Sequence, residues 1–142
     1  MEESSYRQVL TTIIPRACPF EKSILTSCAA CSKAEKHNIA EREIVACGSA
    51  ELLGRCIALR DSLRRNFAFA LGKPHIDGPL PHAQEMRVQC GGLKALQRIF
   101  DGNDGVQDVS ELVFKAQLKY GELVDYPYSQ IVQLANRYYK PR

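Results

Sequence analysis

The sequence lacks several features that would place it in a common class of protein. No apolar run approaches the roughly 20 residues that a membrane-spanning helix needs, so we expect no membrane association. Charge is nearly balanced, because 19 Lys and Arg against 16 Asp and Glu leave a net +3. A dedicated nucleic-acid binder is far more basic, which argues against nucleic acid as the partner. No positively charged segment precedes the short apolar stretch near the N-terminus, as a secretory signal would require, and we therefore expect a cytoplasmic protein.

No catalytic signature, internal repeat or low-complexity tract occurs either. The chain has 142 residues, of which 45% are hydrophobic and 25% charged, a composition typical of one globular domain. Without a catalytic motif, an electron carrier or a binding module is favoured over an enzyme. No feature of the sequence specifies an oligomeric state.

The hydrophobic pattern predicts an all-α fold, a single small domain of about five helices. Residues 1–22, interrupted by Pro15 and Pro19, are expected to form an N-terminal arm, and residues 23–142 the helical domain. Helices are predicted to follow a Ser32–Glu35 capping box, a Ser49 cap and an Asp108 cap. Gly121 is expected to end the third of these. One short extended segment is predicted near residues 86–90, where Met86, Val88 and Cys90 alternate with polar residues.

The cysteines are the distinctive feature of this sequence. There are six, at positions 18, 28, 31, 47, 56 and 90. In a reducing compartment their roles are more often metal binding or redox chemistry than structural disulfides. Only Cys28 and Cys31 form the two-residue-spaced pair that recurs in zinc and iron–sulfur sites. The spacing Cys28-x2-Cys31-x15-Cys47 resembles the first three ligands of high-potential iron–sulfur proteins, over twenty residues only, and it implies no function.

Two further cysteines are expected just upstream of helices, where free amides favour a thiolate. Cys47 precedes the Ser49 cap, and Cys90 precedes Gly91 and Gly92. The two glycines would let the backbone approach a cofactor and donate hydrogen bonds to it. Cys47 carries an objection, because a straight helix at 1.5 Å per residue would place it about 21 Å from the Cys28–Cys31 pair.

Cys56 lies on the apolar stripe of its predicted helix. Its simplest interpretation is a small buried hydrophobic residue, and its second is a replacement ligand. Cys18 lies on the predicted arm and is left outside the ligand set.

Because the remaining cysteines are scattered singly, a cluster inside a helical domain is favoured over a zinc knuckle. We therefore predict an iron–sulfur cluster, of the 4Fe-4S type, that serves electron transfer or redox sensing, for example in a small subunit of a redox complex. The expected metal ligands come from a set of five cysteines, with Gly91 and Gly92 as cofactor-binding residues: Cys28, Cys31, Cys47, Cys90 and, as a substitute, Cys56.

Three alternatives stay open. The first is a zinc-stabilised interaction module, in which His82 joins Cys28, Cys31 and Cys90. The second is a metal-free helical adaptor with buried cysteines. The third is a thiol enzyme in which His82 activates Cys90.

The remaining charged segments point to a partner rather than to another site. Residues 55–73 and the C-terminus are basic, which favours an acidic redox partner protein. The polar run from Asp101 to Asp108 resembles a calcium loop, but its sixth residue is Val106 where that loop needs Gly, so we predict a polar turn.

Overall fold

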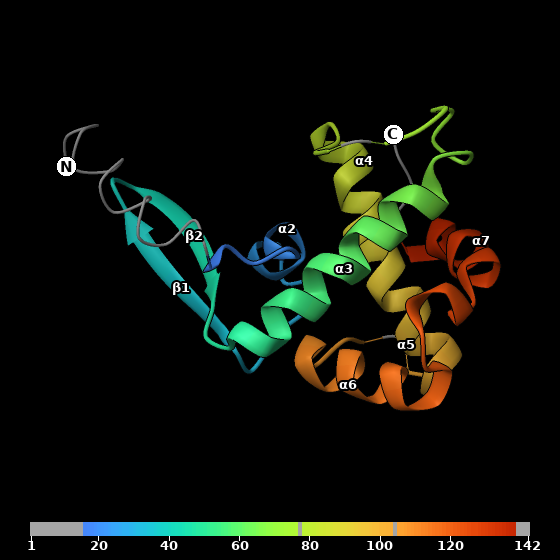
Figure 1. Cartoon of the computed structure of the whole chain (residues 1–142). Helices are drawn as coiled ribbons and strands as arrows, with labels where there is room; N and C mark the ends of the chain where they lie inside the picture. Colours follow the sequence, from blue (N-terminus) through green and yellow to red (C-terminus); the bar gives the residue numbers. More distant parts are fainter. Residues whose placement is uncertain (1–15, 77, 104, 139–142) are drawn as a thin grey trace.

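The computed structural model describes residues 16–76, 78–103 and 105–138, and the remainder of the predicted N-terminal arm lies outside them. A two-stranded hairpin projects from one side of a helical body, and the longest helix leads from the hairpin into that body (Figure 1). The elements are, in chain order, α2 (Glu21–Leu25), β1 (Ala34–Ile39), β2 (Arg42–Cys47), α3 (Ala50–Phe67), α4 (His82–Met86), the π-helical turn η2 (Arg87–Gly91), α5 (Gly92–Asp101), α6 (Val109–Tyr120), the 3₁₀ turn η3 (Leu123–Asp125) and α7 (Tyr128–Tyr138).

The prediction of an all-α fold is wrong, because the fold combines helices with an antiparallel hairpin. The segment that was expected to form a helix from Ser32 to Cys47 forms β1 and β2 instead. Ser32 caps no helix here; its amide donates to the carboxylate of Asp108 at 3.0 Å. Most of the chain is nevertheless helical, as expected.

The hairpin has a continuous register from Ala34 opposite Cys47 to Ile39 opposite Arg42. Its two-residue turn consists of Ala40 and Glu41, whose φ angles are +51° and +69°. Two positive φ values are typical of the type I′ turn, which fits the twist of the strands but favours Asn and Gly. Neither residue is of that kind, so the backbone is strained at the turn.

We expect the double change Ala40→Asn and Glu41→Gly to raise the free energy of unfolding by about 1–2 kcal/mol, because both new residues tolerate the left-handed region. Urea denaturation followed by circular dichroism measures the change. Glu43→Gly, within β2, is the control and should lower stability, since glycine weakens a strand interior. Equal or lower stability of the double variant would contradict the strained turn.

The segment around Cys90 is a second correction. Residues 86–90 are not extended, and Gly91 and Gly92 do not interrupt the chain: α4, η2 and α5 follow one another as a single helical rod from His82 to Asp101. A side chain at Gly91 would meet Ala135 of α7 at 3.0 Å, and one at Gly92 would meet Leu63 of α3 at 3.3 Å. The two glycines therefore allow neighbouring helices to approach the rod closely.

The other caps agree with the sequence. Ser49 accepts a hydrogen bond from the amide of Leu52 at the start of α3. Asp108 accepts one from Ser110 at the start of α6. Gly121, with φ +81°, follows the last residue of α6 as predicted. Each of these devices depends on neighbouring residues only, which is why the sequence alone reveals it.

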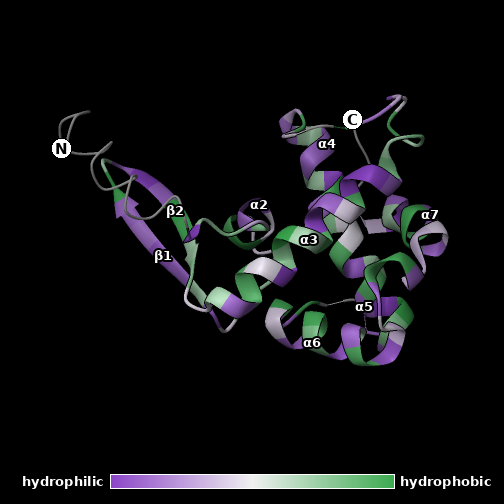
Figure 2. Ribbon diagram, in the orientation of Figure 1, coloured by the Kyte–Doolittle hydropathy of each residue, from purple (hydrophilic) through white to green (hydrophobic). Residues whose placement is uncertain are grey.

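The core lies where α3, the rod, α6 and α7 meet. Phe20, Phe67, Leu63, Leu96 and Ile131 are fully buried there. Figure 2 shows apolar and polar residues interspersed along these helices, whereas β1 is hydrophilic over most of its length. Among the described residues no helix is both long and apolar enough to cross a membrane.

Candidate metal centre

Four cysteines with free thiols line one small cavity between the hairpin, α2 and α3. They are Cys18, Cys31, Cys47 and Cys56. Three of them belong to the predicted ligand set, and Cys18 does not. The rest of the lining is apolar except for Lys33, and it includes Phe20, Ile24, Leu52 and Val109.

Each thiol reaches the cavity from a different element. Cys18 precedes α2 and is fixed by its amide, which donates to the carbonyl of Val45 in β2 at 3.0 Å. Cys47 ends β2, and Cys56 is buried on α3 with 5% of its surface exposed. Because the segment between Cys31 and Cys47 folds back as a hairpin, the 21 Å that a straight helix would impose does not apply.

Cys31 lies in the loop before β1, and the start of α6 holds that loop in place. The amide of Ala30 donates to the carbonyl of Val106 at 3.0 Å, and the amide of Val109 donates to the carbonyl of Ala30 at 2.8 Å. The amide of Ser110 faces the Cys31 sulfur. The favourable helix N-terminus that was predicted for Cys90 is therefore found at Cys31.

Backbone amides approach two of the sulfurs from positions two residues further along the chain. The amide of Phe20 is directed at Cys18, and that of Lys33 at Cys31. Such N–H groups stabilise a thiolate and tune a metal bound to it. The thiol of Cys47 instead donates to the carbonyl of Ser49 at 3.2 Å.

Burial raises the pKa of three of these thiols, those of Cys18, Cys31 and Cys56, which favours their protonated form in the absence of a counter-charge. It raises the pKa of Cys18 to about 11, an effect that the amide of Phe20 opposes and that charge on Cys31 and Cys47 would increase. Burial likewise raises the pKa of Cys31 and of Cys56. Charge on Cys18, Cys31 and Cys47 raises the pKa of Cys56 further, so the four groups are close enough to repel one another when ionised. A bound cation would reverse this repulsion.

The cavity is nearly closed in the structure. Its volume is about 10 Å³, which is room for about one water molecule. In the part of the chain that the structure describes, no three His, Cys, Asp or Glu side chains stand in position to ligate a single ion. Taking up a metal therefore requires the thiols to move relative to one another, and the partly exposed Cys18 and Cys31 lie on loops.

The two remaining predicted ligands are bonded to each other. Cys28 and Cys90 form a disulfide with their Cα atoms 5.9 Å apart, so neither sulfur is a free thiol here. Cys90 lies inside the rod rather than at a helix start. Gly91 and Gly92 do not line the four-cysteine cavity.

The interpretations based on histidine find little support in the geometry. His82 is exposed, and its Nδ1 atom lies 2.9 Å from the ammonium group of Lys22. With Cys90 held in a disulfide, the nucleophile of the alternative thiol enzyme is not available in this form of the protein.

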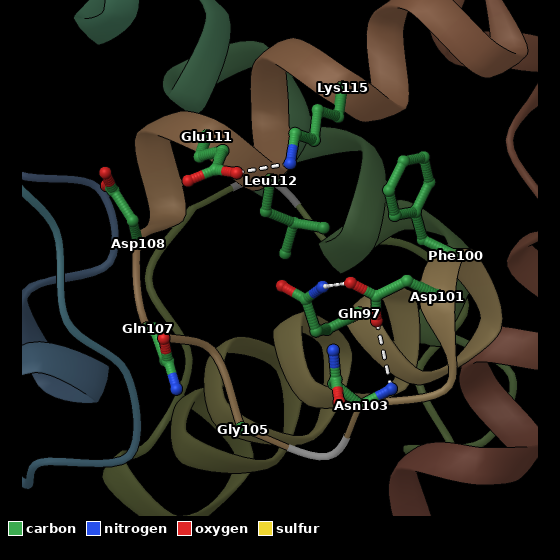
Figure 3. A pocket seen from close by; sticks show the side chains of 10 residues that line it. All are labelled: Gln97, Phe100, Asp101, Asn103, Gly105, Gln107, Asp108, Glu111, Leu112 and Lys115. Carbon is green, nitrogen blue, oxygen red and sulfur yellow. Dashed lines mark hydrogen bonds and ion pairs between the residues drawn. The ribbon is translucent and has the colours of Figure 1, made fainter.

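Described residues of the polar run, among them Asp101, Asn103 and Asp108, line a separate pocket of about 280 Å³ between α5 and α6 (Figure 3). The acidic side chains that line this pocket already have partners. Asp101 accepts from the Asn103 amide at 2.9 Å and from the Gln97 side chain at 2.8 Å, and Glu111 pairs with Lys115. Hydrogen bonds from Asn103 and Gln97 lower the pKa of Asp101. The carboxylates of Asp101 and Glu111 are thus already hydrogen-bonded or ion-paired, as in a polar turn, rather than arranged around a cation.

Comparison with known proteins adds no family. The sequence matches no protein-family model, and no curated protein or solved structure is similar enough to count as a match.

Proposed function

We propose that the protein binds a metal centre through the thiolates of Cys18, Cys31, Cys47 and Cys56, and that the centre is an iron–sulfur cluster of the four-iron type. The observation that carries this proposal is the convergence of four free thiols from four separate segments of the chain on one largely apolar cavity. Clusters of thiolates with no oxygen or nitrogen ligand select iron–sulfur centres or zinc. The ligand set differs from the predicted one, since Cys18 and Cys56 replace Cys28 and Cys90.

The spacing of the four cysteines supports a cluster over a zinc knuckle. Cys28, which forms the closely spaced pair with Cys31 in the sequence, is held in a disulfide. No two of the remaining four cysteines are separated by only two residues, whereas structural zinc sites usually contain such pairs. A bound cluster would supply one-electron transfer. The chain's own contribution would be to hold the irons, to direct amides at the sulfurs and to exclude water with Phe20, Ile24 and Val109.

Zinc is the second candidate, and the small cavity favours it. A single ion occupies little more space than the cavity already provides, whereas a four-iron core needs the loops of Cys18 and Cys31 to move outward. In this case the metal would stabilise an interaction module and perform no redox chemistry.

The partner and the compartment belong to the same proposal. Arg65 is exposed on α3, and Lys73 lies in the segment that follows this helix. Their cationic side chains would form ion pairs with an acidic redox partner. We place the protein in the cytoplasm. In that compartment a disulfide such as Cys28–Cys90 is usually transient and serves catalysis or redox sensing.

Anaerobic purification followed by metal and sulfide analysis tests the proposal. We expect brown protein with equal amounts of iron and acid-labile sulfide, four of each per chain, whose visible absorption bleaches on reduction with dithionite. Colourless protein with one zinc per chain would reject the cluster and support the second candidate. Folded protein that takes up neither metal on reconstitution would reject both.

A further inference from the structure

The Cys28–Cys90 disulfide joins the cysteine-bearing part of the chain to the helical body. Cys28 belongs to the loop between α2 and β1, and Cys90 lies in η2, in the middle of the rod. The two residues are 62 positions apart in the sequence. Cys28 stands three residues before Cys31, so the bond anchors the same loop that carries one of the proposed ligands.

The four thiols connect the same two parts. Cys18, Cys31 and Cys47 come from residues 16–49, whereas Cys56 comes from α3 of the helical body. A metal held by all four would therefore be a second link between parts that the disulfide already joins. Two links across one boundary influence each other, because the disulfide holds the Cys31 loop in the closed arrangement, in which no three of the described side chains are placed to ligate one ion.

We propose that the Cys28–Cys90 disulfide is a reversible redox lock on the four-cysteine metal centre. This inference rests on the proposed function. When oxidised, the bond holds the Cys31 loop against the rod in the closed arrangement and weakens metal binding; when reduced, it releases the loop, so that the thiols can move into position, and strengthens binding. The protein would then retain or release its metal according to the thiol redox state of its surroundings.

Exposure indicates which sulfur reacts. Cys28 is partly exposed, whereas only 5% of Cys90 is exposed, so an incoming thiolate can reach the sulfur of Cys28. A dithiol reductant would attack Cys28 and displace Cys90 as a thiolate, which takes up a proton. The second thiol of the reductant then attacks the mixed disulfide and releases Cys28. The balance is two electrons and two protons transferred to the protein and one disulfide formed in the reductant.

The lock is expected to modulate metal binding rather than abolish it. Even without the disulfide, Ala30 keeps its backbone hydrogen bonds to Val106 and Val109, and Ser32 keeps its bond to Asp108. Coupling between two sites typically changes affinity by about 5–150-fold, and the remaining bonds place this case near the lower end, at about tenfold. By reciprocity, bound metal must make the disulfide easier to reduce by the same factor.

The test measures the Zn²⁺ dissociation constant by competition with a coloured chelator, under anaerobic conditions and without added thiols. The oxidised wild-type chain is compared with the double variant Cys28→Ser and Cys90→Ser, and circular dichroism confirms that the variant is folded. We expect binding to the variant to be about tenfold tighter. Equal or weaker binding by the variant would overturn the lock while leaving the proposed metal centre intact. Failure of both proteins to bind Zn²⁺, and of the wild type to take up a cluster, would instead reject the proposed function.

A second measurement applies even if the double variant does not fold. Wild-type protein is equilibrated in thiol–disulfide buffers with and without Zn²⁺, and free thiols at positions 28 and 90 are counted by alkylation and mass spectrometry. The equilibrium constant for reduction should rise about tenfold when Zn²⁺ is present. An unchanged constant at saturating Zn²⁺ would overturn the lock.

Discussion

Replacing Cys56 with serine is expected to lower metal affinity by more than about a hundredfold, since even an outer hydrogen-bonding partner of a metal ligand is worth about 10–100-fold. Cys56 is the single thiol that the helical body contributes, and it is buried on α3 next to the cavity. Serine keeps the size of the side chain but offers a hydroxyl, which is a poor ligand for a soft metal. Cys18→Ser is expected to have an effect of the same order, although the sequence alone placed that residue outside the ligand set.

The sharpest control is another cysteine with the same burial. Cys90, like Cys56, is only 5% exposed, but it lies in the rod and is bonded to Cys28. Removing Cys28 and Cys90 together should not weaken binding and should strengthen it by about tenfold, through the released loop. Metal content and chelator competition on the purified variants measure both effects. A larger loss in the Cys28 and Cys90 variant than in Cys56→Ser would restore the ligand set that the sequence predicted.

Loss of metal must be distinguished from loss of structure. A serine hydroxyl buried without a partner costs about 1–3 kcal/mol of stability. Urea denaturation of the metal-free proteins measures that cost directly. If metal-free Cys56→Ser is folded at the concentrations used and yet binds no metal, the loss of metal binding is due to the missing Cys56 thiolate.

The helices could be predicted where local chemistry determines them. Ser49 and Asp108 begin helices because their side chains accept amide hydrogens two or three residues further on. The hairpin could not be predicted in this way. Its strands depend on pairing between residues up to thirteen positions apart, and the Ala40–Glu41 turn contains none of the usual turn residues. The capping-box pattern at Ser32 and Glu35 indicated a helix that this pairing overrides.

Two glycines misled the prediction at Cys90 for a different reason. Consecutive glycines usually break a helix, but Gly91 and Gly92 lie inside the rod, where a Cβ atom would meet Ala135 at 3.0 Å and Leu63 at 3.3 Å. These contacts come from helices distant in the sequence. The predicted break is what suggested a helix N-terminus, and hence a ligand role, at Cys90.

The roles of the cysteines also depend on contacts between residues that are distant in the sequence. The sequence singled out Cys28 and Cys31 by their spacing, yet the fold pairs Cys28 with Cys90 and gives Cys31 to the cavity. Cys18 offered only one hint, the proline that follows it, a neighbour also seen beside cluster cysteines. Its role depends on the bond between its amide and Val45, which exists only once the hairpin has formed.

Glu85→Gln is expected to lower the free energy of unfolding by about 3–5 kcal/mol, because it leaves a buried arginine without its carboxylate. Glu85 of α4 is 2% exposed and Arg64 of α3 is 9% exposed. The guanidinium donates to both carboxylate oxygens, from Nη2 to Oε1 and from Nε to Oε2 at 3.3 Å. Asp61, whose nearest oxygen is 3.8 Å from Arg64, is half-exposed and also binds Arg60, so it is a weak substitute.

The matched control is Glu51→Gln, which removes an exposed pair with Arg55 one turn away on α3 and should change stability by no more than about 0.5 kcal/mol. Urea denaturation of both variants measures the difference. An exposed ion pair contributes up to about 1 kcal/mol. If Glu85→Gln lowers the free energy of unfolding by less than that, the buried pair does not join α3 to the rod as described. Replacing both partners, with Arg64→Met and Glu85→Leu, should recover much of the loss, since neither charge then remains buried alone. The ion pair joins α3, the helix that carries Cys56, to the rod that carries Cys90. Glu85→Gln should therefore also weaken metal binding, and the double variant Arg64→Met and Glu85→Leu should restore it.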